Sequence, residues 1–165
     1  MLWNNRALKS LTLANCQLGK VAAESIGEGL TKNSTLYSLD ISENSFPAES
    51  MQSWGSQKPK KLKYLKSLDM SGNHSMGKND VQYLLRCFRN LKFQDTKVCP
   101  NLRELNLKDT NMSEEAAKDL LLLLASNTKL VKINVENNSL PTHYAVDIGK
   151  ACKRNKIYEK ENALP

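Results

Sequence analysis

An irregular spacing of leucines, written several times along the chain, constrains the fold more than any other feature. The first copy, LKSLTLANCQL, starts at Leu8 and places apolar residues at its first, fourth, sixth and eleventh positions. The same skeleton starts again at Leu36, Leu65, Leu102 and Leu130, at spacings of 28, 29, 37 and 28 residues. Chance does not explain six constrained positions that recur five times, so the chain repeats one structural unit.

Each copy contains the pattern of one short strand followed by one helix. In the x-L-x-L segment, two apolar side chains point to one side of a strand and polar side chains point to the other. A single strand and helix cannot bury their apolar faces alone, whereas stacked copies form a continuous core. A period of about 28 residues with this core is the signature of the leucine-rich repeat. The sequence therefore predicts an α/β solenoid, with parallel strands on its concave face and helices on its convex face.

The repeat register also predicts where each element lies. Ser113 and Thr142 are expected to cap two of the helices, and Val21 and Val146 are expected on inward-facing helix stripes. The helix after the second strand is expected to be short, because glycine and proline interrupt it. The repeat domain is expected to span 1–158, followed by a polar tail at 159–165. Strands are expected at 10–13, 38–41, 67–70, 104–107 and 132–135, and helices at 20–32, 79–91, 114–126 and 142–154.

The ninth position of each repeat carries a small side chain that can hydrogen-bond. The chain turns inward after each strand, and a buried polar side chain there can bond backbone groups of neighbouring repeats. These residues are predicted to form a structural ladder, and the mixture of Asn with Cys or Thr is similar to the ribonuclease-inhibitor class of repeats. The ladder residues are Cys16, Asn44, Asn73, Thr110 and Asn138.

The composition of the chain limits the kinds of partner and cofactor that it is expected to bind. The formal net charge is +7, with local basic clusters at 58–66 and 149–156. These clusters are typical of a solvated repeat edge, and an acidic protein surface or a membrane lipid is the alternative partner. Aromatic residues do not interleave with the lysines as an RNA-binding platform would require, so no nucleic-acid binding is expected. None of the four cysteines forms a C-x-x-C pair, which favours a reduced, cytoplasmic protein without a metal or other cofactor.

One segment resembles a phosphate-binding loop. GNHSMGKN, at 72–79, differs from G-x-x-x-x-G-K-[S/T] at its last residue, where Asn79 replaces the hydroxyl that would hold Mg²⁺. Asn73 inside this segment is also assigned to the ladder. His74 and His143 stand in predicted turns without visible catalytic partners. The segment is therefore interpreted as a repeat turn, and the chain as a non-enzymatic protein.

Side chains on the concave face are the predicted binding surface. Each strand presents polar residues at alternate positions, and these form columns across the repeats. Tyr37 and Arg103 flank the strands and are the largest candidates for binding anchors. The complete candidate set is Tyr37, Asp40, Asp69, Arg103, Glu104, Asn106, Lys132 and Asn134.

The order of unequal repeats resembles the late repeats of CARMIL proteins (capping protein, Arp2/3 and myosin-I linkers). The resemblance is carried by NCQL, SLDISEN, the long third repeat starting at LDMSGNHSMGKND, and ASNTKLVKINVENN. TKLVKINVENN is also similar to the final repeat of tropomodulin, an actin-filament end binder. The resemblance implies an interaction scaffold in actin cytoskeleton regulation, with actin-regulatory proteins as partners. The alternative is a GTPase-activating or other regulatory repeat protein of the Ran-activator type.

The first residues carry a further sign of repetition. Asn33 and Asn127 each stand three residues before the first leucine of a repeat, and Asn5 has the same place before Leu8. Residues 1–5 are therefore expected to match the end of a preceding repeat's helix. On this interpretation the chain is a fragment of a longer solenoid, and its open N-terminal repeat is expected to associate with another chain or with the rest of the parent protein.

Overall fold

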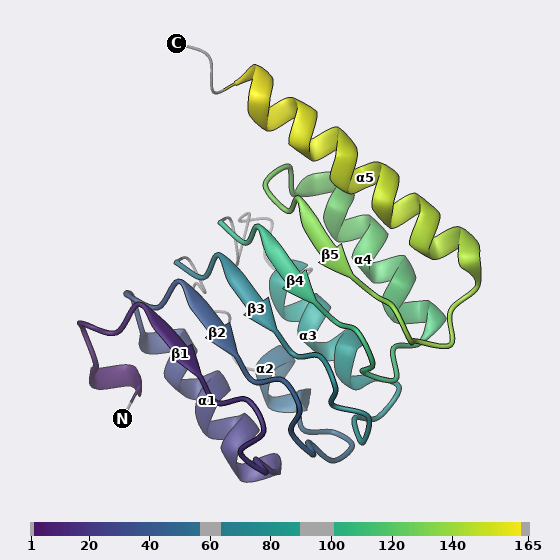
Figure 1. The fold of residues 1–165 in the computed structure, drawn as a ribbon. Helices are drawn as coiled ribbons and strands as arrows, with labels where there is room; N and C mark the ends of the chain where they lie inside the picture. The colour runs from purple at the N-terminus through teal and green to yellow at the C-terminus, as the bar shows by residue number, and fades with distance from the viewer. Residues whose placement is uncertain (1, 57–63, 90–100, 163–165) are drawn as a thin grey trace.

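The computed structural model describes residues 2–56, 64–89 and 101–162, which form a single parallel sheet backed by helices (Figure 1). The strands lie side by side in chain order, and each pairs with the next in parallel. Equivalent repeat positions face one another, so Leu11, Leu39, Leu68, Leu105 and Ile133 form one row. The predicted α/β leucine-rich repeat solenoid is confirmed. The strands are β1 (Ser10–Thr12), β2 (Ser38–Asp40), β3 (Ser67–Asp69), β4 (Glu104–Asn106) and β5 (Lys132–Asn134).

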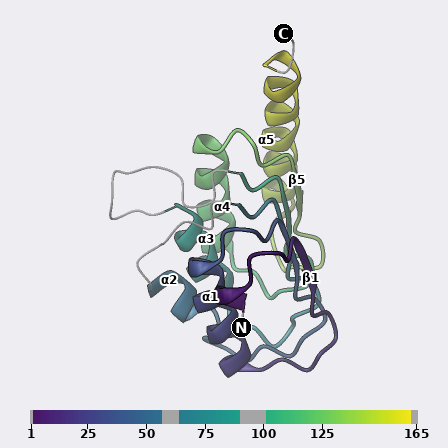
Figure 2. The same cartoon turned by 90° about the vertical axis from the view of Figure 1, so that its left-hand side faces the viewer.

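The helices of the first four repeats form the second layer, behind the sheet, and the last helix lies beyond the fifth strand at the end of the stack (Figure 2). Each strand ends one residue earlier than expected, although backbone hydrogen bonds continue beyond it, as from Leu13 N–H to the Asp40 carbonyl at 2.8 Å. The helices of the first and fourth repeats have the expected bounds, and the helix of the second repeat has only five residues. The elements are η1 (Leu2–Asn4), α1 (Lys20–Lys32), α2 (Gln52–Ser56), α3 (Asp80–Arg89), α4 (Glu114–Ser126) and α5 (Thr142–Glu161).

Three local expectations are wrong. Val21 is 77% exposed and Val146 is 53% exposed. In α1 the buried stripe runs through Ala23, Ile26 and Leu30, and a residue two places away from such a stripe lies on the opposite side of the helix. Val146 is likewise two places from a buried residue of α5. Thr142 is inside α5 rather than its cap, whereas Ser113 does cap α4 by accepting a hydrogen bond from Ala116 N–H at 3.2 Å.

Helix α5 continues through Glu161, seven residues beyond its expected end, so residues 159–161 belong to a helix rather than to a tail. Its Asn155 is buried and donates to the carbonyls of Asn127 and Leu130, as Asn33 donates to those of Leu2 and Asn5. Asn155 therefore has the place of a repeat-ending asparagine. The residue six places later, where each repeat has the leucine or isoleucine of its strand, is Glu161, so no apolar residue draws the chain into a sixth strand.

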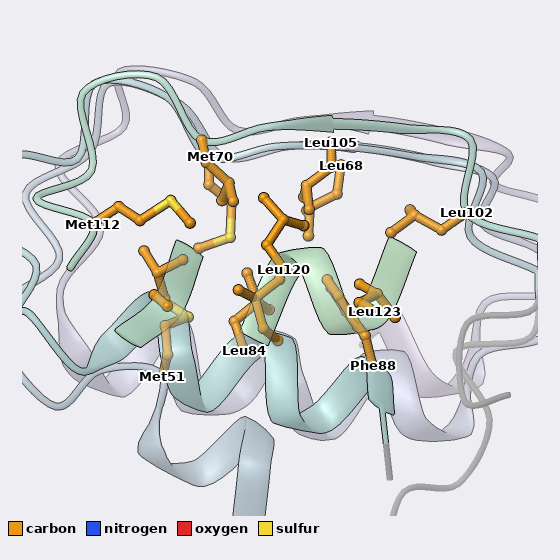
Figure 3. Packing of buried hydrophobic residues seen from close by; sticks show 14 of the residues in the cluster. Met51, Leu68, Met70, Leu84, Phe88, Leu102, Leu105, Met112, Leu120 and Leu123 are labelled. Carbon is orange, nitrogen blue, oxygen red and sulfur yellow. The ribbon is translucent and has the colours of Figure 1, made fainter. Parts of the chain in front are cut away.

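The core lies between the sheet and the helices (Figure 3). Leu68 and Leu105 point from the strands toward Leu84 and Phe88 of α3 and Leu120 of α4. Fully burying one such side chain stabilises the fold by about 1.5–3 kcal/mol. Flexible methionine side chains fill the irregular spaces near the turns. The buried methionines are Met51, Met70, Met76 and Met112.

The first repeat is less well covered than those behind it. Leu8, Leu11, Leu13 and Leu18 are half-buried, whereas their counterparts in the second repeat are buried. In a solenoid each repeat packs only on its neighbours, and β1 is an edge strand of the sheet. Residues 2–4 form η1, which packs against the C-terminal part of α1 through Leu2 and Gly29.

A glycine in α1 makes room for the tryptophan of the next repeat. A Cβ atom on Gly27 would lie 2.6 Å from the indole ring of Trp54. The buried indole N–H donates to the Ala23 carbonyl at 2.8 Å, so the ring packs flat against the helix surface. This contact joins α1 to the short helix α2, which offers few other apolar residues.

We predict that Gly27→Ala destabilises the fold. Overpacking against Trp54 costs about 1–3 kcal/mol, which exceeds the ~0.5–1 kcal/mol that Ala gains over Gly inside a helix. Chemical denaturation measures the change, and fluorescence in a Trp3→Phe background reports displacement of the Trp54 ring. Gly149→Ala is the matched control, because no atom lies within 4 Å of its added Cβ. A Gly27→Ala variant as stable as the Gly149→Ala variant would contradict this packing.

Candidate functional site

The side chains that point away from the helices form columns across the strands, and these make up the strand face. The register pairs Ser38 with Ser67 and Asp40 with Asp69, so residues about 28 apart in sequence are neighbours in space. The first column changes from small to charged along the sheet, and the second changes from acidic to amide side chains. The columns are Ser10, Ser38, Ser67, Glu104 and Lys132, then Thr12, Asp40, Asp69, Asn106 and Asn134.

The second column is also structural. The Asp40 carboxylate accepts hydrogen bonds from Ser42 N–H at 3.0 Å and its hydroxyl at 2.6 Å, and Asp69 makes the same two bonds with Ser71. Such bonds to the residue two places ahead form Asx turns, and they end each strand. The other Asp69 oxygen accepts from the Asn106 amide at 2.9 Å. These side chains are therefore held in fixed orientations on the strand face.

The two last repeats continue this arrangement with amides and paired charges. Asn106 and Asn134 accept from the N–H groups of Lys108 and Glu136, which repeats the turn. Lys132 lies 3.3 Å from the carboxylate of Glu104. This ion pair is exposed and contributes less than about 1 kcal/mol, but it neutralises this end of the face.

The second position of each repeat forms a rim where the strands begin. Tyr37 N–H donates to the Lys9 carbonyl, and Lys66 N–H donates to the Tyr37 carbonyl, each at 2.7 Å. Both lysine ammonium groups lie 5.1 Å from the centre of the Tyr37 ring, one on each side. Two lysines and an aromatic ring from three different repeats therefore lie together in space.

Arg103 occupies the same rim position in the fourth repeat and is bound by α5. Its two terminal nitrogens donate to the two carboxylate oxygens of Glu159, and the Nη2–Oε2 distance is 2.7 Å. This bidentate hydrogen bonding lowers the pKa of Glu159 and raises the pKa of Arg103. The sequence interpretation missed Glu159, because it placed that residue in a polar tail.

The ladder residues connect neighbouring repeats below the strand face. Asn44 accepts from Cys16 N–H and Leu18 N–H, each at 3.0 Å, and its amide donates to the Leu13 carbonyl at 2.9 Å. In the last repeat, Asn138 bonds the fourth repeat in the same manner. Asn73 is fully buried and donates to the Ile41 carbonyl of the preceding repeat at 3.1 Å. Three asparagines thus bond backbone groups of the repeat before them.

The other two ladder residues, Cys16 and Thr110, donate side-chain hydrogen bonds to carbonyl groups of their own repeats. The Thr110 hydroxyl donates to the Leu107 carbonyl of its own repeat, and Asn111 reaches the preceding repeat instead, at the Met76 carbonyl. Cys16 is exposed, and its thiol lies 3.3 Å from the Ala14 carbonyl. Between the third and fourth repeats, the connecting side chain is therefore Asn111 rather than the residue at the ninth position.

A left-handed residue precedes every ladder position and turns the chain inward. The backbone φ angle there lies between 52° and 70° in all five repeats. Glycine, asparagine and aspartate tolerate this conformation best, and Glu43 is the exception. The sequence contains this signal as a column at the eighth position, which the sequence analysis did not use. The column is Asn15, Glu43, Gly72, Asp109 and Asn137.

A buried carboxylate occupies the loop that resembles a phosphate-binding motif. Asp80 accepts from Gly77 N–H at 2.7 Å, from Glu49 N–H at 2.9 Å and from Met51 N–H at 2.8 Å. It thereby fills the N-terminal end of α3, where a phosphate would bind. The carboxylate of Glu43 lies against Gly72 at the start of the same loop. Two carboxylates would repel a phosphate, whereas Lys78 is exposed.

The described residues show no metal centre and no membrane-spanning helix. No group of three or more His, Cys, Asp or Glu residues could hold a metal ion within 2–56, 64–89 and 101–162. No helix in the same part of the chain is long and apolar enough to cross a membrane.

Comparison with known sequences agrees with this architecture. A family model described as "Leucine Rich repeat" matches residues 61–85 and 98–121. The human protein "NACHT, LRR and PYD domains-containing protein 13" is 26% identical over 174 residues, which cover 90% of this chain. The chain spans 16% of that relative's length. The family model and the solenoid of parallel strands and helices thus agree on a leucine-rich repeat fold.

Solved structures extend the similarity to almost the whole chain. A structure titled "Leiomodin-1 Actin-Binding Site 2 (ABS2)" has a TM-score of 0.77 at 14% identity, covering 98% of this chain and 88% of that chain. The tropomodulin C-terminal domain of Caenorhabditis elegans has a TM-score of 0.68 at 13% identity, covering 96% and 90%. At this identity the similarity defines the fold, and it favours neither the CARMIL proteins nor another single family.

We predict that Asn44→Leu lowers the free energy of unfolding by about 1–3 kcal/mol, because Cys16 N–H, Leu18 N–H and the Leu13 carbonyl lose their buried partner. Urea denaturation measures this change. His74→Ala is the control: its imidazole lies 3.3 Å from Asp109, but both side chains are exposed, and the variant should match the parent chain. Equal unfolding midpoints for the two variants would show that the ladder adds no stability.

We predict that Glu159→Gln frees the end of α5. Without the carboxylate, amides near residues 156–161 should exchange hydrogen faster, while the sheet stays protected. The lowered pKa of Glu159 sets the pH dependence: the ion pair is complete above the ordinary glutamate pKa and is lost as pH falls through the lower folded-state pKa. Hydrogen exchange, corrected for intrinsic rates, measures both effects. Glu161→Gln is the control, and equal protection of α5 in both variants would contradict the prediction.

Proposed function

We propose that this chain is a non-enzymatic protein-interaction module that acts in actin cytoskeleton regulation in the cytoplasm. The observation that carries the proposal is the strand face itself. Its polar columns are fixed by turn hydrogen bonds, and its first three repeats carry the small residues Ser10, Ser38 and Ser67. A rigid surface of small and polar residues leaves room for a partner's side chains and loses little entropy on binding.

The actin part of the proposal is supported by the structural similarity. Two solved domains that superpose on almost the whole chain are a leiomodin segment titled as an actin-binding site and a tropomodulin domain. The CARMIL resemblance in the sequence points toward the same cellular process. We regard CARMIL-like scaffolding as one form of this function. Association through the half-buried first repeat would be a second contact of such a scaffold.

The Ran-activator type of function is the alternative. It would place a nucleotide-dependent partner on the same repeats, without requiring that this chain bind nucleotide itself. The loop at 72–79 does not support direct nucleotide binding, because the Asp80 and Glu43 carboxylates occupy it. A GTP hydrolysis assay with candidate GTPases separates this alternative from the proposed function.

We predict that the 165-residue chain binds actin and that Ser38→Arg/Ser67→Arg abolishes this binding, because two long cations fill the small-residue part of the strand face. Co-sedimentation with filaments and anisotropy with labelled monomeric actin measure the two forms of binding. Ser25→Arg/Ala125→Arg adds the same charge on exposed positions of α1 and α4 and should bind normally. Absence of binding by the parent chain, combined with faster GTP hydrolysis by a GTPase, would favour the alternative function.

A further inference from the structure

The basic rim, defined as Lys9, Tyr37 and Lys66, has a chemistry that the strand face does not share. Tyr37 is 39% exposed and carries an ammonium group 5.1 Å from its ring centre on each side. Backbone hydrogen bonds hold the three residues in neighbouring strands. The rim is therefore a row of cation, aromatic ring and cation just before β1, β2 and β3. The beginnings of these strands lie side by side at one edge of the sheet (Figure 1).

The positive charge of the rim is not neutralised within the described part of the chain. Neither Lys9 nor Lys66 forms an ion pair with a residue of 2–56, 64–89 or 101–162. Farther along the sheet, Arg103 is bound by Glu159, and Lys132 is paired with Glu104. Among the cations at the described rim positions, Lys9 and Lys66 are thus the ones that no carboxylate neutralises.

The molecule itself contains an example of what this rim position binds. Arg103 stands at the same repeat position as Lys9 and Lys66. It lies next to Lys66 along the rim, where Arg103 N–H donates to the Lys66 carbonyl at 2.8 Å. Its guanidinium holds a carboxylate presented by helix α5. This pair shows that a cation at a rim position can bind a carboxylate on a helix whose end lies near the beginnings of the strands.

We propose that the basic rim binds an acidic helical segment of a partner protein. Lys9 and Lys66 are two strand spacings apart, about 10 Å, and carboxylates seven residues apart on a helix are separated by about 10.5 Å. One carboxylate would bind each lysine, and an apolar side chain halfway between them would pack on the Tyr37 ring. The inference deepens the proposed protein-interaction function by naming where the partner binds and what chemistry it carries.

A phosphate polymer fits the rim less well than an acidic protein segment. Nucleic acid carries charge continuously along its backbone and would continue from the rim toward Arg103 and Lys132, whose charges Glu159 and Glu104 already neutralise. On the strand face it would meet Asp40 and Asp69. Two isolated cations beside one aromatic ring instead match a short segment with two carboxylates and an apolar residue.

The test uses fluorescence anisotropy with the full chain. The probe is a fluorescein-labelled alanine-based helical peptide with glutamates seven residues apart and a leucine midway between them. Lys9→Glu/Lys66→Glu should weaken peptide binding at least tenfold, and Tyr37→Ala should weaken it severalfold. Lys118→Glu/Lys153→Glu makes the same charge change at exposed positions of α4 and α5 and should stay within twofold of the parent. A peptide with lysines in place of both glutamates should bind the Lys9→Glu/Lys66→Glu chain, which also shows that this variant is folded.

Three results would overturn the inference. The first is no binding of the acidic peptide by the parent chain. The second is equal weakening by the rim variant and the Lys118/Lys153 control variant. The third is rim-dependent binding of phosphatidylserine vesicles or single-stranded RNA without binding of the acidic peptide. If actin binding requires Ser38 and Ser67 but tolerates the rim variant, and the peptide does not bind, the proposed function stands and the rim inference fails.

Discussion

Parallel pairing in a register that advances by one repeat per strand is the interaction on which the rest of this structure depends. Because of it, each strand residue of the first three repeats lies beside residues that are 28 or 29 positions away in the sequence. The register builds the leucine rows of the core, aligns the columns of the strand face and brings Lys9, Tyr37 and Lys66 together. A shift of one residue would exchange the buried and exposed faces of every strand.

Buried polar side chains maintain this register where the chain leaves the sheet. A left-handed residue at the eighth position of each repeat turns the chain inward, and the ladder side chain that follows bonds the backbone. Asp80 has a similar role at the start of α3, where it joins two repeats through three backbone N–H groups. The chain thus meets the hydrogen-bonding needs of its turns with side chains supplied by neighbouring repeats.

The sequence predicted the strands, most helices and the columns, because all of these follow from the repeat period. It failed where the outcome depends on contacts outside the pattern. Val21 appeared apolar and helical, but the register of Ala23 and Ile26 decides which face of α1 is buried. The end of α5 could not be located, because the absence of a strand leucine at Glu161 is visible only once Asn155 is recognised as a repeat-ending residue. The Arg103–Glu159 pair and the Asp80 contacts were missed for the same reason.

The same limit applies to the candidate site. The sequence placed Tyr37 beside the strands but could not show that two lysines flank its ring, since they stand in other repeats. It likewise offered Asp40 and Asp69 as binding residues without indicating that both end their strands by Asx turns. A polar residue on a repeat surface can stabilise a turn and also be available to a partner. Its hydrogen bonds show whether it has the structural role.

The register can be measured directly at the rim by nuclear Overhauser effects from the ring protons of Tyr37. If equivalent repeat positions are neighbours, the ring protons should show cross-peaks to side-chain methylenes of both Lys9 and Lys66, in the unmodified chain and without bound partner. Cross-peaks to only one of the two lysines, or to residues one position away in each neighbouring repeat, would contradict the register and with it the proposed arrangement of the binding surface.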